Sequence, residues 1–289
     1  MAVRAAVAAS IVAAMLITAA AAGEELRDVK QAADAVYFSK STEVVVMGCF
    51  DQREGSDWQV FLQVARELNR YGGVGIGSTI TKGVWSRYLE SEADKLPAVV
   101  VWTSYDPDTG RIRKGKKTKL IFPGPFKFES LYKFLVRESL PLVLRLPAND
   151  GADFQKRQML GMHSGFPKLF IFMSKREVEP DSVAEVALQH KQTTICVYYM
   201  VDPKNEEDEG TQVMKSLGLE SASLPAAAIA SSASVKAFDG DLTKSEGLSL
   251  FVKEFLQGQE EFVPQPTAQA SKGDRNKKSN ARKKKAKEL

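Results

Sequence analysis

The chain has 289 residues, a net charge of +4 and 44% hydrophobic residues, which is enough apolar material for two domains of ordinary size. Its two cysteines exclude a small disulfide-rich scaffold. Its two histidines and two cysteines form no cluster with the spacing of metal ligands. The sequence therefore predicts a globular protein without a metal site or another cofactor.

The first 22 residues predict a secretory signal peptide. Arg4 precedes an apolar, alanine-rich run that ends in small residues, with the predicted cleavage site after Ala22. A membrane anchor is the alternative, but the run contains few large apolar residues. No later stretch of about 20 apolar residues follows, so no membrane span is predicted.

Residues 259–289 predict a disordered basic tail. Between Gln265 and Leu289 there are nine Lys or Arg residues against two acidic ones, which leaves a net charge of −4 for residues 23–264. The segment is rich in Lys, Ser, Asn and Gly and cannot build an apolar core.

The first predicted domain spans residues 23–139 and alternates strands with helices. Buried strands read as runs of β-branched residues, and helices show apolar residues at a spacing of three and four. The predicted elements are a strand at 42–50, a helix at 56–70, a weak strand at 72–80, a short helix at 83–91, a strand at 98–105, a turn at 106–112 leading to a further strand, and a helix at 127–139.

The second predicted domain spans residues 140–258 and repeats this alternation. The predicted elements are strands at 142–146, 168–173, 193–201, 226–230 and 235–238, and helices at 151–162, 181–190, 211–219 and 245–257. A β-α-β-α-β-β-α order thus occurs twice. It predicts an α/β protein of two tandem domains, each a central mixed sheet flanked by helices.

Leu-Pro-Ala comes directly before an apolar strand twice, at residues 96–98 and 224–226. Proline is normally excluded from central strands because it cannot donate to the ladder. With the surrounding order of elements, this placement resembles the thioredoxin fold, in which a proline at this position is cis. The resemblance implies that Pro97 and Pro225 are structural cis-prolines.

The likeness extends to one family. The stretches "STEVVVMGCFDQREGSDWQVFLQVARELN" and "LPAVVVWTSYDPDTG" look like the b domain of protein disulfide isomerases. The stretches "PKLFIFMSK", "VDPKNEEDEGTQVMKSLGLESASLPAAAIA" and "LSLFVKEFLQGQ" look like the b′ domain that follows it. The resemblance covers about residues 24–258 and rests on the order and spacing of segments.

The sequence departs from the catalytic members of this family. Those members carry C-x-x-C after the first core strand, where a thiolate attacks disulfides. We assign the corresponding stretches to "FDQREGSDW" and "LPANDGADF", and neither contains cysteine. We therefore expect a redox-inactive b–b′ protein that is not an enzyme, with Cys49 and Cys196 as core residues.

Two alternatives belong to other functional classes. A thiol oxidoreductase or isomerase would have to use the lone Cys49, although nothing near it in sequence lowers its pKa. A calsequestrin-like lumenal calcium-binding protein would need a strongly acidic surface, and a charge of −4 is far too small.

The resemblance implies that a hydrophobic b′ surface binds unfolded or partly folded polypeptides, as a chaperone or escort. Such a surface needs exposed, adaptable apolar side chains. The candidate peptide-binding residues are Phe154, Met159, Leu160, Met162, Phe166, Met214 and Leu217. The alternative for each is a place in the core. A catalytic protein disulfide isomerase is a second candidate partner, and no nucleic acid partner is expected.

The predicted location is the lumen of the endoplasmic reticulum, with secretion as the alternative. The last residues, "AKEL", resemble the KDEL-type retrieval signal, although Lys287 departs from the usual pattern.

Overall fold

A computed structural model describes residues 26–89, 96–106, 113, 115–146, 151–174, 180–219 and 222–258. The predicted signal peptide, the basic tail and the AKEL sequence lie outside the described residues. In the part of the chain that is described, no helix combines the length and the apolar character needed to cross a membrane.

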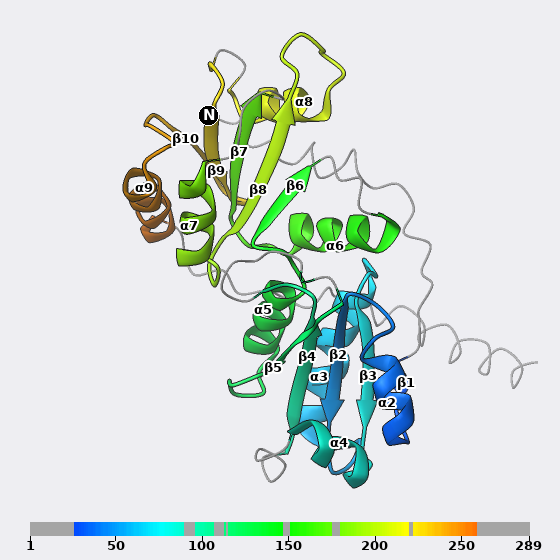
Figure 1. The fold of residues 1–289 in the computed structure, drawn as a ribbon. Coiled ribbons are helices and arrows are strands. Elements are labelled where there is room, and N and C mark those ends of the chain that lie inside the picture. The colour runs from blue at the N-terminus through cyan, green and yellow to red at the C-terminus, as the bar shows by residue number, and fades with distance from the viewer. Residues whose placement is uncertain are drawn as a thin grey trace, which may run out of the picture.

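The first half of the chain forms a five-stranded sheet (Figure 1). Its elements are β1 (Arg27–Asp28), α2 (Ala32–Phe38), β2 (Val44–Cys49), α3 (Gly55–Asn69), β3 (Gly75–Thr79), α4 (Lys82–Leu89), β4 (Ala98–Thr103), β5 (Thr118–Ile121) and α5 (Phe128–Glu138). The strand order is β1-β3-β2-β4-β5. Strand β3 pairs parallel with β1 and β2, whereas β4 runs antiparallel to β2 and β5, so the sheet is mixed.

The second half forms a separate sheet of the same topology. Its elements are β6 (Val143–Leu146), α6 (Gly151–His163), β7 (Lys168–Ser174), α7 (Asp181–Gln189), β8 (Ile195–Val201), α8 (Glu209–Ser216), β9 (Ala226–Ala230), β10 (Val235–Phe238) and α9 (Ser245–Gln257). The order β6-β8-β7-β9-β10 repeats that of the first sheet element by element. The predicted fold class, two tandem thioredoxin-like units, is confirmed.

The predicted β-α-β-α-β-β-α order is two elements shorter than the observed one. In the first half β1 and α2 were not predicted, whereas in the second half the predicted strand at 142–146 and helix at 151–162 correspond to β6 and α6. Both halves follow β-α-β-α-β-α-β-β-α, because β1 and α2 precede β2 just as β6 and α6 precede β7. Strand β1 has only two residues, and it forms by pairing with Gly77 and Ser78 of β3, fifty positions away. No local pattern of alternating residues exists over so short a strand, so sequence periodicity could not reveal it.

One buried apolar cluster, which we call the junction core, contains side chains of both halves. On the first half it includes the face covered by α3 and α5, and on the second half the face covered by α6 and α8. Its members include Val44, Val46, Phe61, Leu131, Leu135, Leu144, Leu160, Phe170, Phe172 and Tyr199. The opposite faces have cores of their own, under α2 and α4 in the first half and under α7 and α9 in the second.

Candidate functional site

Both proline positions singled out in the sequence have the predicted geometry. The peptide bonds Leu96–Pro97 and Leu224–Pro225 are cis. Each proline directly precedes a strand that pairs antiparallel with the middle strand of its sheet, β4 with β2 and β9 with β7. In catalytic protein disulfide isomerases, which the sequence resembles, the C-x-x-C follows the first core strand. The resemblance therefore implies that such thiols would lie in the loop after the middle strand of each half.

In the first half, this loop joins Cys49, the last residue of β2, to α3. The Cys49 side chain is fully buried, and its burial raises the pKa of the thiol to about 12. In the loop itself, Arg53 forms an ion pair with Asp28 of β1, and its guanidinium lies 5.9 Å from the ring centroid of Trp58. The hydrogen bond from Arg53 lowers the pKa of Asp28 below its usual value.

In the second half, the loop predicted from the sequence is the wrong one. The stretch "LPANDGADF" joins β6 to α6, which corresponds to the connection between β1 and α2. The middle strand of the second sheet is β7, so the equivalent loop is residues 175–180, of which 175–179 lie outside the described residues. Its sequence, "KREVEP", also lacks cysteine. Cys196 lies in β8 and is buried.

The candidate peptide-binding residues do not form the predicted exposed patch. Phe154, Leu160, Phe166 and Met214 are buried. Met162 and Leu217 are half-buried against the junction core, and Met159 is 42% exposed. The prediction of one continuous exposed patch is therefore wrong for the four buried side chains.

The reason is the position of α6, which lies between the two sheets (Figure 1). A β-carbon on Gly161 would stand 2.8 Å from Leu144 of β6, so the helix approaches its own sheet closely along this side. Leu160 and Phe166 are enclosed in the junction core. Helix α6 carries more apolar residues than contact with one sheet requires, because it packs against both the second sheet and the first half of the chain.

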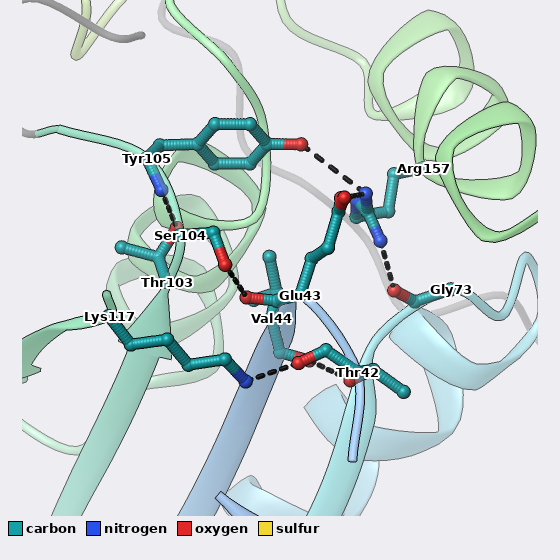
Figure 2. A network of polar contacts seen from close by, with 9 residues as sticks. All are labelled: Thr42, Glu43, Val44, Gly73, Thr103, Ser104, Tyr105, Lys117 and Arg157. Atoms are coloured by element: carbon teal, nitrogen blue, oxygen red, sulfur yellow. Dashed lines mark hydrogen bonds and ion pairs between the residues drawn. The ribbon is translucent and has the colours of Figure 1, made fainter. Parts of the chain in front are cut away.

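Arg157, which is not among the residues predicted from the sequence, reaches from α6 into the first half (Figure 2). Its side chain is 1% exposed. The guanidinium donates to the carbonyl oxygen of Gly73 at 2.8 Å, forms an ion pair with the Glu43 carboxylate, and lies 3.4 Å from the hydroxyl of Tyr105. The sequence did contain a signal for the burial of this side chain, because residue 157 falls on the same helical face as Phe154, Leu160 and Gly161.

A second basic side chain holds the segment before β2 in place. Lys117 donates through Nζ to the carbonyl oxygen of Ser39 at 2.6 Å and to that of Thr42. Burial lowers the pKa of Lys117 to about 8, partly opposed by the Glu43 carboxylate. The backbone carbonyl of Glu43 also accepts hydrogen bonds from Ser104. The residue that binds Arg157 is thus fixed by its own half of the molecule (Figure 2).

The acidic segment between β8 and α8 is organised by helix capping. Asp208 is the N-cap of α8, and its carboxylate accepts a hydrogen bond from the backbone N–H of Thr211 at 3.1 Å. Throughout the described ranges, no three His, Cys, Asp or Glu side chains gather closely enough to hold a metal ion.

Comparison with known proteins agrees with this reading of the fold. No protein-family model matches the chain. A protein disulfide-isomerase of Drosophila melanogaster is 25% identical over 246 residues, which cover 82% of this chain and 44% of that protein. The zinc-bound form of human ERp44 has a TM-score of 0.50 and 16% identity, covering 81% of this chain and 60% of that one. The chain is thus similar in sequence to a protein disulfide-isomerase and similar in fold to ERp44.

The likeness to the fly isomerase is partial in length, since this chain spans less than half of it. The similarity to ERp44 concerns the fold, because 16% identity is too low to carry residue roles across.

Proposed function

We propose that this chain is a non-catalytic, b–b′ type member of the protein disulfide isomerase family that binds unfolded or partly folded polypeptides in the endoplasmic reticulum lumen. One observation carries the proposal. The loops that follow the middle strands β2 and β7, where a catalytic thiol would stand, contain no cysteine in either half.

The buried Cys49 thiol supports the non-catalytic part of the proposal. Attack on a disulfide requires a thiolate, and a thiol with a pKa of about 12 is almost entirely protonated at neutral pH. Arg53, in the loop that follows Cys49, forms an ion pair with Asp28, and the raised pKa of Cys49 comes from burial of the thiol. Catalysis by Cys49 alone, the rival activity, would require the end of β2 to open.

The polypeptide-binding part of the proposal now rests on a smaller set of side chains. Met159, Met162 and Leu217 keep accessible surface, and Val213 and Leu224 are also half-buried along the junction core. Methionine adapts its shape to varied apolar partners, which suits the binding of unrelated sequences. The proposed surface runs over the outer side of α6 and the end of α8. The predicted signal peptide and the AKEL sequence support the lumenal location.

Polypeptide binding is tested with reduced, carboxymethylated α-lactalbumin as a permanently unfolded probe. We expect Met159→Asp and Leu217→Asp to weaken its binding at least several-fold. The thermal stability should change little in Met159→Asp and fall more in Leu217→Asp, because Leu217 is half-buried against the junction core. A charge at a contact would have to lose water on binding, which is unfavourable without a partner. The matched control is Leu250→Asp on α9, where the leucine is 58% exposed on the opposite side of the second sheet.

Equal loss of binding in all three variants, or in none of them, would contradict the proposed surface. The redox part has a separate test, in which the native protein should not reduce insulin and iodoacetamide should modify Cys49 only after denaturation. Insulin turnover that disappears in Cys49→Ser would replace the proposal with the thiol oxidoreductase alternative.

A further inference from the structure

We infer that the two thioredoxin-like halves are locked in one fixed orientation and unfold as a single cooperative unit, with Arg157 as the residue that positions α6 against the first half. Domains joined in one chain move relative to each other by default, unless their interface is large and apolar or specifically bonded. This inference does not depend on the proposed function.

One face of α6 makes the contact. Asp153, Lys156, Arg157 and His163 repeat at helical spacing and meet the segment 71–73 at the end of α3. The imidazole of His163 stacks on the ring of Tyr71, with the centroids 5.6 Å apart and the planes 5° from parallel. The contact thus involves most of the length of the helix.

At Gly73 the backbones of the two halves touch. A β-carbon there would stand 2.4 Å from the carbonyl oxygen of Asp153, a distance that real structures do not show. Because the obstructing atom belongs to the backbone of α6, no side-chain rotation could relieve the clash. The helix is therefore held at a separation that only glycine permits.

Arg157 fixes the orientation of α6 relative to the first half. A fully buried guanidinium is unfavourable unless its donors find acceptors. Here the acceptors, the Gly73 carbonyl and the Glu43 carboxylate, are separated by 84 and 114 residues from Arg157 along the chain, and both belong to the other half. The planar fork of arginine can satisfy two such acceptors only in one orientation.

A second contact closes the other side of the junction. Glu138 at the end of α5 forms an ion pair with Lys191 after α7 at 2.9 Å, and the guanidinium of Arg137 lies 5.9 Å from the ring centroid of Phe166. The connecting residues 139–142 are all buried. The two contacts on either side of a buried connection oppose hinge motion in either direction.

The orientation is tested by pulsed electron–electron resonance between spin labels on Tyr37→Cys in α2 and Leu250→Cys in α9, both highly exposed positions. The buried Cys49 and Cys196 should stay unlabelled. We expect one narrow distance distribution in the otherwise unchanged protein. A broad distribution, or two separate unfolding transitions in calorimetry, would overturn the inference.

Two adjacent glycines provide a matched pair of variants. Gly72 and Gly73 both have positive φ, +71° and +76°, so alanine is strained to a similar degree at either position. A β-carbon on Gly72 would meet only the flexible Lys156 side chain, at 3.0 Å. We expect Gly73→Ala to broaden the distance distribution and Gly72→Ala to leave it narrow. Failure of Gly73→Ala alone to fold would support the same conclusion.

Arg157→Met tests the polar part of the lock, with Gln155→Met on the exposed side of α6 as the control. Methionine keeps an unbranched apolar stem, but it is shorter than arginine and loses both bonds to the first half. The expected result is a broadened distribution, with a second unfolding transition, in Arg157→Met only. An unchanged narrow distribution in both Arg157→Met and Gly73→Ala would overturn the role of this contact.

Discussion

The two halves share one topology but present opposite faces to the junction. The first half turns the α3 and α5 side of its sheet toward the junction core, whereas the second half turns the α6 and α8 side. Helix α2 of the first half and α6 of the second are equivalent in chain order. Yet α2 packs with α4 in a core of the first half alone, and α6 contacts both halves. Two helices at equivalent positions of the same topology can therefore differ in whether they also contact the other half of the chain.

The middle strands show what this difference does to the choice of side chains. On the junction side, β2 carries Val44 and Val46, while β7 carries Phe170 and Phe172. The two phenylalanines stack with Tyr199 of β8, with centroids 5.8 to 6.4 Å apart. Equivalent strand positions therefore hold residues of very different volume.

The largest expected effect follows from that difference in volume. Phe172→Ala should lower the free energy of unfolding by about 4 kcal/mol, because a fully buried aromatic ring leaves a cavity that its neighbours cannot fill. Val46→Ala, at an equally buried position in β2, should lower it by about 2 kcal/mol. Urea denaturation measures both values. Similar losses would show that the two faces are packed alike, contrary to the comparison.

The junction can also be compared with the surface through two ion pairs. Lys191→Met leaves Glu138, which is 9% exposed, without its partner, and should lower the free energy of unfolding by about 2 kcal/mol. Lys236→Met breaks an exposed pair with Glu254 and should change it by less than about 1 kcal/mol. If both variants behave alike in urea denaturation, the junction pair is no more protected from water than the surface one.

The smallest expected effect concerns Lys168 at the start of β7. Burial lowers the pKa of its ammonium group to about 8, from an ordinary value of 10.5. The unfolded chain therefore holds this proton more tightly than the folded one, so stability should rise as the pH increases from 8 to 10.5. Below pH 8 the unfavourable burial of the charge is fully present.

Lys168→Met removes that charge while keeping most of the side chain. The full fall in pKa would correspond to ~3 kcal/mol. Because Lys168 is only half-buried and water screens its charge, we expect Lys168→Met to raise the free energy of unfolding at pH 7 by about 1 kcal/mol, a gain that disappears near pH 10.5. Thermal denaturation of both proteins across this range provides the measurement, with Lys82→Met as an exposed control in the first half. A pH-independent difference would show that packing, and not the buried charge, is responsible.

Much of the molecule could be predicted from the sequence because its signals are local. Apolar periodicity located every helix and strand from β2 to α9, with ends that differ by a few residues. Leu-Pro-Ala before two apolar strands marked Pro97 and Pro225, whose bonds are cis. The lack of cysteine after both middle strands is a property of the sequence alone, and it held even though the loop in the second half was misassigned.

What only the tertiary structure decided depends on contacts between distant residues. The equivalence of β7 with β2 follows from strand pairing, and β1 exists only because β3 lies beside it. A helical pattern shows that α6 has an apolar face, but it does not show that a second surface covers the neighbouring side. Arg157 can be buried because Gly73 and Glu43, 84 and 114 residues away, supply its acceptors. A local sequence pattern cannot predict contacts between residues so far apart in the chain.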